Sequence, residues 1–275
     1  MKKPKVGLQL YSIRKAMTED MDSALAKVKA MGYDNVEFSG GRYGRSAAET
    51  RALLDKHGLI CISVHQSPSF YETDPVDAVE YVKILGAKFC VIPICRLSVY
   101  QENWEETMAL YKEMAAAFRK EGIRLLYHNH DHELTCLPGD STPILDKIFT
   151  EVPELKPEFD TCWISYGGVD PVSYIQKYNS DLDLVHLKDY CCEALPQFPM
   201  WQLMKDGYQK PEKRSDVRFQ YLPVGEGVEN WTNILSAIQD STANYVIVEQ
   251  DESRDRDPMD AVRMSRQYLK KNFNI

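Results

Sequence analysis

The sequence contains no CxxC pair among its seven cysteines. Two of them, Cys191 and Cys192, are adjacent, and adjacent cysteines have poor geometry for an ordinary disulfide. An odd number of cysteines without a recurring spacing fits neither a disulfide framework nor a thiolate zinc site. We therefore expect reduced thiols and a cytoplasmic protein.

The sequence also lacks a segment that could insert into a membrane. No apolar run approaches the length of a bilayer span. The first apolar stretch is too short for a signal peptide, because Gln9, Ser12 and Arg14 interrupt it. We therefore expect no membrane association.

Positive charge is scarce as well. The formal net charge is -8, the isoelectric point is near 5.4, and no basic stripe is present. Nucleic acid binding through phosphate contacts is therefore not expected. No GxGxxG motif follows the first apolar strand pattern, which argues against a dinucleotide-binding fold.

What the sequence does contain is a strand-then-helix unit that repeats from end to end. The chain has 275 residues, of which 44% are apolar, enough for a large core. Eight alternating units with no linker predict an α/β fold, a closed (β/α)8 TIM barrel, as a single domain over residues 1–275. An open doubly wound sheet is the alternative. The predicted strands cover residues 6–10, 35–38, 60–65, 89–94, 123 into the run at 127–133, 156–160, 182–188 and 245–250.

Local signals mark the helix boundaries. Ser46 and Glu49 have the spacing of a capping box, in which each side chain satisfies a free amide at the helix start. Asp-Pro pairs at 74–75, 170–171 and 257–258 also predict helix starts, because proline lacks the amide that the first turn leaves unpaired. One long interval, at about 190–227, has neither pattern and predicts a long loop after strand seven.

The densest cluster of reactive side chains is the run 127–133, which reads Tyr-His-Asn-His-Asp-His-Glu. Alternation along a strand would place His128, His130 and His132 on one face. Converging imidazole and carboxylate groups suit a divalent metal ion or proton transfer. The alternative is that these are ordinary polar groups of a loop.

In a barrel, the carboxyl ends of the strands surround one pocket. Nearly every predicted strand ends in a group that can bind a metal or transfer a proton, although each alone could be a helix cap or an ion pair. These groups are Glu37, His65, His128, His130, Glu133, Asp160, His186, Lys188, Glu249 and Asp251.

Two carboxylates, one imidazole and one further nitrogen or oxygen ligand form a site for one divalent ion: Mn, Mg, Co or Zn. Such an ion can hold a hydroxyl and a carbonyl oxygen of a sugar and stabilise the enediolate that forms when the adjacent proton is removed. Return of the proton to another face or carbon is epimerisation or isomerisation. Loss of a leaving group beta to the carbonyl is dehydration or elimination.

Several motifs together resemble the sugar phosphate isomerase/epimerase superfamily, the xylose isomerase-like TIM barrels that also include endonuclease IV and inosose dehydratase. The resemblance covers nearly the whole chain. The motifs are the run 127–133, Phe-Asp-Thr-Cys-Trp at 159–163, Gly-Gly-Val-Asp-Pro at 167–171, His-Leu-Lys-Asp at 186–189, Val-Gly-Glu-Gly at 224–227 and Val-Glu-Gln-Asp at 248–251.

The resemblance implies one divalent metal ion held by Asp160, His186 and Glu249. For the fourth ligand it implies Glu133, with His130 as the alternative ligand or the acid/base. Lys188 matches the lysine that the family places near the substrate. The likeness to endonuclease IV is one of fold, because the sequence lacks the ligands of a three-zinc cluster and a basic face for DNA.

The predicted catalytic residues are therefore His130, Glu133 and Glu249. Five further residues are expected to contact substrate, although His65 and Trp163 could be buried packing residues and Glu37 or Lys188 could serve in an ion pair. These five are Glu37, His65, His128, Trp163 and Lys188.

We expect a metal-dependent isomerase or epimerase of a sugar or keto-sugar. A lyase acting on an inosose or a 3-keto-glycoside at the same site is the first alternative, and a non-catalytic sugar-binding barrel is the second. The expected partner is a small carbohydrate. Aromatic residues in the long loop suit either a lid or a subunit contact in a homo-oligomer.

Overall fold

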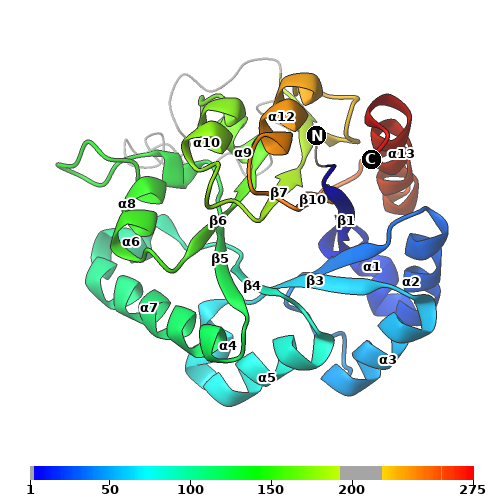
Figure 1. The fold of residues 1–275 in the computed structure, drawn as a ribbon, viewed down its shortest axis with the longest axis horizontal. Helices are drawn as coiled ribbons and strands as arrows, with labels where there is room; N and C mark the ends of the chain where they lie inside the picture. The colour runs from blue at the N-terminus through cyan, green and yellow to red at the C-terminus, as the bar shows by residue number, and fades with distance from the viewer. Residues whose placement is uncertain (1–2, 193–218, 255) are drawn as a thin grey trace.

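The computed structural model describes residues 3–192, 219–254 and 256–275. Eight parallel strands close into a barrel, with helices around its outside (Figure 1). The barrel strands are β1 (Lys5–Gln9), β2 (Asn35–Phe38), β3 (Ile60–His65), β4 (Phe89–Ile92), β5 (Arg124–His128), β6 (Lys156–Asp160), β7 (Leu184–Leu187) and β10 (Tyr245–Val248).

Hydrogen bonding between the first and last strands closes the barrel. Leu8 of β1 pairs with Val248 of β10 on one side, and Gln9 pairs with Glu37 of β2 on the other. The order around the barrel is β1-β10-β7-β6-β5-β4-β3-β2, so neighbouring strands follow one another in the chain and β1 closes the ring. The predicted (β/α)8 barrel is confirmed, and the open doubly wound sheet is excluded.

The helices lie on the outer face of the barrel and begin at several of the predicted caps. Ser46 and Glu49 form the complete capping box. Asp74, Asp170 and Asp257 each accept an amide hydrogen bond just before a proline in the first turn. The helices are η1 (Leu10–Ile13), α1 (Arg14–Glu19), α2 (Met21–Ala30), α3 (Ala47–His57), α4 (Pro68–Thr73), α5 (Pro75–Leu85), α6 (Leu97–Glu102), α7 (Trp104–Lys120), η2 (His132–Leu134), α8 (Ile144–Glu151), α9 (Thr161–Tyr166), α10 (Pro171–Lys177), α12 (Trp231–Gln239) and α13 (Pro258–Phe273).

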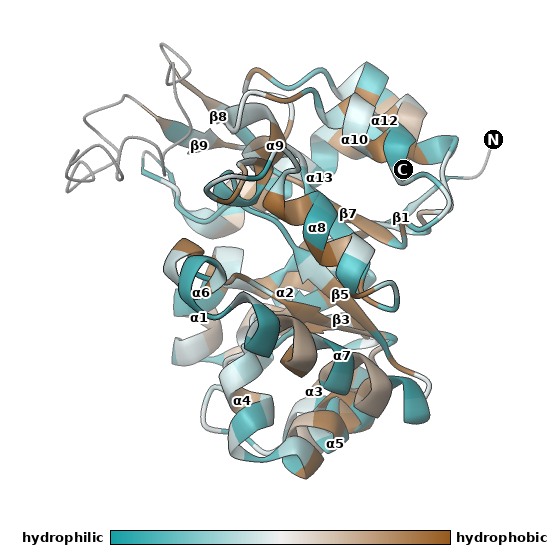
Figure 2. Ribbon diagram, turned by 90° about the vertical axis from the view of Figure 1, so that its left-hand side faces the viewer, coloured by the Kyte–Doolittle hydropathy of each residue, from teal (hydrophilic) through white to brown (hydrophobic). Residues whose placement is uncertain are grey.

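The interior of the barrel is apolar at one end and polar at the other. Strand alternation explains this division, because Leu126, Leu184 and Ile247 belong to the inner apolar cluster and the residue two positions later on each strand faces the same way. Figure 2 shows the barrel strands β3 and β5 coloured as hydrophobic. The same inward rows therefore end in polar side chains near the carboxyl ends of the strands.

The predicted loop at about 190–227 begins and ends in a short antiparallel pair, β8 (Asp189–Cys191) with β9 (Gln220–Leu222). The interval 193–218 lies outside the described residues. The carboxylate of Asp189 accepts hydrogen bonds from residues that follow β9, namely from the amides of Gly225 and Gly227 and from the indole of Trp231. Through these hydrogen bonds Asp189 holds the loop after β9 next to Lys188.

No helix in the described part of the chain is both long enough and apolar enough to cross a membrane. The described cysteines form no disulfide.

Candidate active site at the carboxyl ends of the barrel strands

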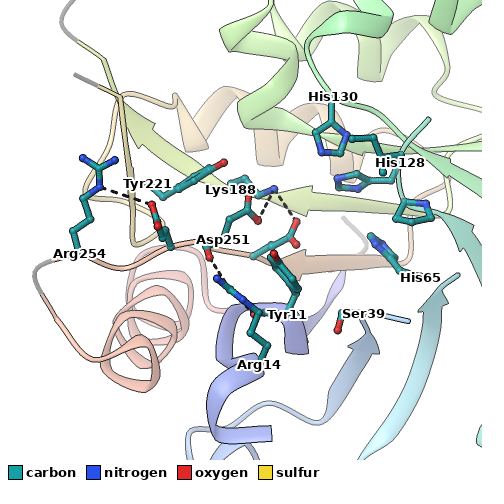
Figure 3. A pocket seen from close by; sticks show the side chains of 14 residues that line it. Tyr11, Arg14, Ser39, His65, His128, His130, Lys188, Tyr221, Asp251 and Arg254 are labelled. Atoms are coloured by element: carbon teal, nitrogen blue, oxygen red, sulfur yellow. Dashed lines mark hydrogen bonds and ion pairs between the residues drawn. The ribbon is translucent and has the colours of Figure 1, made fainter. Parts of the chain in front are cut away.

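A cavity of about 900 Å³ opens at the carboxyl ends of the strands. Figure 3 shows Lys188 between the histidine side of this cavity and the rim that carries Arg254. Five of the sequence-predicted site residues line it: His65, His128, His130, Lys188 and Glu249. The other lining residues are Tyr11, Arg14, Ser39, Pro93, Ile94, Tyr221, Asp251, Glu252 and Arg254.

Four buried side chains from four strand ends converge beside the cavity, and two of them, His128 and Glu249, line it. The four are His128, Asp160, His186 and Glu249, and their potential ligand atoms all lie within 4.8 Å of one another. Three of the four are the ligands implied by the resemblance. The fourth is His128, the last residue of β5, in the place that the sequence analysis assigned to Glu133 or His130.

Lys188 neutralises part of this group. Its Nζ atom lies 2.8 Å from Asp160 Oδ2, 2.8 Å from Glu249 Oε2 and 3.3 Å from Asp251 Oδ1. Burial alone would lower the pKa of Lys188, but the surrounding carboxylates hold that pKa well above its ordinary value. The ammonium group therefore stays charged at neutral pH.

The pKa values of Asp160 and Glu249 shift in opposite directions. Burial raises the pKa of Asp160 to about 6, although Lys188 acts against this rise. Burial would also raise the pKa of Glu249, but Lys188 and His186 hold it below its ordinary value.

A second polar group lies beneath the first, deeper in the barrel. Here His65 Nε2 lies 2.8 Å from Glu158 Oε2 and 3.0 Å from Glu37 Oε1. Glu37 is fully buried and also accepts hydrogen bonds from Gln9 and Ser63. Glu37 and His65 were predicted as substrate contacts. The structure places Glu37 under the site, and His65 belongs to the same deeper group although its ring also borders the cavity.

Glu158 is the site residue that the sequence analysis missed. It lies in the middle of β6, two positions before Asp160, so alternation places both carboxylates on the inward face. Its lysine and proline neighbours hide this pattern, because they make β6 a weak strand by composition. The available signal was the spacing from Asp160 once β6 had been assigned.

The residues present fit a divalent metal ion. Two imidazoles and two carboxylates without a thiolate suit Zn, Mn or Co. Asp160 Oδ2 is buried without a hydrogen bond of acceptable geometry, although Lys188 Nζ is close to it. Four buried carboxylates surround Lys188, His65 and His186 in the described part of the chain. Burial alone would lower the pKa of the two imidazoles, but the carboxylates hold it above its ordinary value, so this group of side chains attracts positive charge.

The run 127–133 does not continue as a strand. β5 ends at His128, and His132 already belongs to the short helix η2, so the prediction that three histidines share one strand face is wrong. His132 Nε2 lies 2.7 Å from the carbonyl oxygen of Cys95, outside the cavity lining. The backbone turns after His128 because the following residues satisfy their amides locally.

Glu133 lies apart from the four converging side chains. Its carboxylate accepts hydrogen bonds from the Tyr127 hydroxyl (2.6 Å) and the His130 amide (2.8 Å), and His132 Nε2 is 3.0 Å away. The Tyr127 hydroxyl also accepts a hydrogen bond from Tyr100. Glu133 therefore holds the backbone of His130 in place and does not border the cavity.

His130 lines the cavity, and one of its ring nitrogens is buried without a hydrogen bond. Its Nδ1 atom has no hydrogen-bond partner among the described residues, and its ring stacks on Trp163 at 5.2 Å. Burial lowers the pKa of His130 to about 3, so the imidazole is neutral. Trp163 lies behind His130 and Lys188, in an aromatic cluster with Phe219, and does not itself line the cavity.

The rim contains residues for which the sequence analysis had no signal. Tyr11 and Arg14 follow β1, and Arg14 Nη1 donates hydrogen bonds to the carbonyl oxygens of Tyr11 (3.0 Å) and Asp251 (2.7 Å). Arg254 lies across the cavity and pairs with Glu252. Their roles depend on how the loops after β1 and β10 fold, which no local motif encodes.

The chain is similar in sequence to known proteins over most of its length. The model of the family described as xylose isomerase-like TIM barrel matches residues 25–272. An inosose dehydratase of Clostridium beijerinckii is 22% identical over 280 residues, which cover 90% of this chain and 88% of that protein.

Two solved structures share the fold. A sugar phosphate isomerase/epimerase from Parabacteroides distasonis has a TM-score of 0.78 at 20% identity and covers 99% of this chain and 95% of its own. The IOLI protein, solved with a bound zinc atom, has a TM-score of 0.68 at 14% identity and covers 97% of each chain. At these identities the likeness establishes the fold.

Proposed function

The chain belongs to the xylose isomerase-like TIM barrel family, and on that premise we propose that it is a divalent-metal-dependent lyase. Its substrate is a polyhydroxylated ketone, an inosose or a 3-keto-glycoside, from which it removes water or another beta substituent. The observation that carries this proposal is the group His128, Asp160, His186 and Glu249, buried beside an open cavity and next to Lys188.

The four buried side chains are the proposed metal ligands, with His128 in place of Glu133. A divalent ion bound there supplies a Lewis acid that polarises a ketone and stabilises negative charge on its oxygen. Lys188 adds a fixed positive charge at the same end of the cavity, 2.8 Å from two of the ligands.

His130 is the proposed base. Its ring lines the cavity, and its Nδ1 atom has no competing partner among the described residues. In the proposed reaction the imidazole of His130 takes a proton from the carbon next to the ketone, and the electrons of that C–H bond form a carbon–carbon double bond. The hydroxyl on the next carbon leaves with its bonding electrons and takes up the proton from His130, so water departs.

The choice of elimination over isomerisation rests on the relatives. Isomerisation shares the first proton transfer and differs only in where the proton returns, so the site chemistry alone supports both reactions. Relatives that align with nine-tenths of this chain carry the name inosose dehydratase. This likeness supports the lyase over the isomerase or epimerase that the sequence analysis favoured.

The test is to incubate the enzyme, freed of metal and then reloaded with Zn, Mn or Co, with a panel of inososes and 3-keto-glycosides. A lyase produces a conjugated enone, the enol form of a 1,2-diketone when the adjacent carbon carries a hydroxyl, and this product absorbs in the near ultraviolet. We expect this absorbance with at least one substrate, only in metal-loaded samples. Turnover to a saturated isomer would favour the isomerase, and no turnover of any substrate would favour a sugar-binding barrel.

A further inference from the structure

We infer that Glu37, His65 and Glu158, the lower layer, hold the two metal-binding histidines in opposite tautomers, so that His128 binds the ion through Nε2 and His186 binds it through Nδ1. This inference rests on the metal site of the proposed function. In this role the lower layer orients the imidazole rings of His128 and His186 and does not bind the ion itself.

His186 is held from two sides. Its Nδ1 atom faces the upper group, 2.9 Å from Glu249 Oε2. Its Nε2 atom faces the lower layer, 2.6 Å from Glu37 Oε1 and 3.4 Å from Glu158 Oε2. A carboxylate can only accept a hydrogen bond, so without an ion both nitrogens of His186 can carry a proton. An ion in the upper group would take the place of the proton on Nδ1, whereas Nε2 keeps its proton toward Glu37. The lone pair is then on Nδ1, which faces the proposed ion.

His128 has the reverse orientation. Its Nδ1 atom lies 3.0 Å from Glu158 Oε2 in the lower layer, and its Nε2 atom lies 3.7 Å from Asp160 Oδ2 in the upper group. By the same reasoning Nδ1 carries the proton and Nε2 is the free ligand atom. One carboxylate layer therefore directs both rings, although the two rings use different nitrogens.

The lower layer is itself fixed. His65 Nε2 lies between the two carboxylates, and Gln9 donates a hydrogen bond to Glu37 at 2.7 Å. Glu37 and Glu158 are completely buried, so no solvent competes for them. A histidine that donates its second nitrogen to a carboxylate is a more basic and better oriented ligand, and loss of such a partner typically costs about 10–100-fold in metal affinity.

A rival role for the lower layer is to hold a second ion. His65, His128, Glu158 and His186 also have potential ligand atoms within 4.8 Å of one another, and Glu158 Oε1 has no hydrogen-bond partner among the described residues. A second ion there would need the nitrogens that we assign as protonated. The two roles therefore predict different metal contents and different proton positions.

The first experiment measures Zn²⁺ affinity by competition with a chromophoric chelator. Glu158→Gln and Glu37→Gln keep the shape of each side chain and are expected to weaken binding by about 10–100-fold. Glu133→Gln is the matched control, because it changes a buried carboxylate that touches none of the four proposed ligands. Wild-type affinity in both layer variants would overturn the inference.

The second experiment needs no substitution. Long-range ¹H–¹⁵N NMR of the ¹⁵N-histidine-labelled, zinc-loaded protein identifies the protonated nitrogen of each ring. We expect His128 protonated at Nδ1, His186 protonated at Nε2, and one zinc ion per chain by elemental analysis. Two ions per chain, or the same tautomer in both rings, would overturn the inference. A wild-type protein that binds no divalent ion would overturn the proposed metal site as well, whereas ion binding without turnover would count only against the proposed reaction.

Discussion

At the scale of single residues, His130 differs from the other histidines of the cavity. The rings of His65 and His128 are engaged by buried carboxylates, whereas the Nδ1 atom of His130 has no partner among the described residues. The position of His130 depends on Glu133, which accepts its amide hydrogen, and on Trp163, which stacks on its ring. A neutral imidazole can accept a proton, and its lowered pKa makes His130 a weak base in the free protein.

His130→Ala should therefore abolish proton transfer without emptying the metal site. We expect turnover to fall by about 10²–10⁴-fold, the usual contribution of a general acid–base group, while zinc content stays at the wild-type level. The measurements are initial rates and elemental analysis on the same preparation. His57→Ala, at an ion pair with Asp22 away from the cavity lining, is the control and should leave both unchanged. Loss of zinc in His130→Ala would instead identify His130 as a ligand.

Burial also changes the charge state of Glu229. It lies in the loop after β9, its amide donates to Asp189, and its Oε1 atom is buried without a hydrogen-bond partner among the described residues. Burial raises the pKa of Glu229 from its ordinary value of 4.5 to about 8, although a hydrogen bond to Ser165 lowers it. Because the pKa is raised on folding, its contribution to stability is complete below about 4.5 and is lost as the pH rises to about 8.

Glu229→Gln should remove this pH dependence, because glutamine stays neutral. Between about pH 5 and pH 8.5, we expect the unfolding free energy of the wild type to fall by about 4 kcal/mol relative to the variant. Urea unfolding at several pH values measures the difference. Glu226→Gln, at an exposed ion pair with Arg256, is the control. Parallel pH profiles for wild type and Glu229→Gln would show that Glu229 is ionised in the folded protein.

At the scale of elements, local chemistry decides where most helices begin. Helix α3 shows this clearly, because Ser46 Oγ accepts the Glu49 amide and the Glu49 carboxylate accepts the Ser46 amide. Helix α4 offers a natural contrast, since Ser67 occupies its N-cap position but makes no capping hydrogen bond.

Ser46→Ala should therefore destabilise the protein by about 1 kcal/mol, and Ser67→Ala should have an effect near zero. The two substitutions remove the same hydroxyl from the same formal position of two helices. The difference between their urea midpoints isolates the capping bond. Equal midpoints would mean that the capping box of α3 adds nothing to the stability of the folded chain.

The elements that sequence could predict are those with local determinants. The strands and caps depend on alternation, glycine, proline and short polar side chains, so all eight barrel strands were predicted. The end of β5 was not, because alternation of polar residues continues past His128 although the strand does not. His128 was predicted to contact substrate and not to bind the ion, and Glu158 was not predicted as a site residue. Their roles depend on which nitrogen or oxygen faces a neighbouring strand.

At the scale of the whole molecule, closure of the barrel is what creates the site. The proposed ligands come from β5, β6, β7 and the end of β10, and the layer beneath them from β2, β3 and β6. These strands come together only when the barrel closes, so an unfolded chain cannot present the same ligand set. Cytoplasmic location, homo-oligomer formation and the absence of nucleic acid binding stay predictions from the sequence.

An ion that binds only the closed barrel must stabilise it. At a free ion concentration of 100 times Kd, we expect about 2.7 kcal/mol of added stability, and a rise in Tm of roughly 5–10 °C for a chain of this size. Thermal unfolding with zinc and with a chelator measures the shift. Asp160→Asn, which removes one proposed ligand, should reduce it. If divalent ions left Tm unchanged, the folded barrel would not bind them in preference to the unfolded chain.

A time course of one inosose in deuterated water, followed by proton NMR with zinc-loaded and with metal-free enzyme, distinguishes the lyase from the isomerase. The account predicts that the loaded enzyme forms an unsaturated product, that His130→Ala does not, and that the metal-free enzyme leaves the substrate unchanged. An epimer or ring isomer labelled with deuterium, without any unsaturated product, would contradict the lyase. Equal conversion by the metal-free enzyme would contradict the proposed metal site.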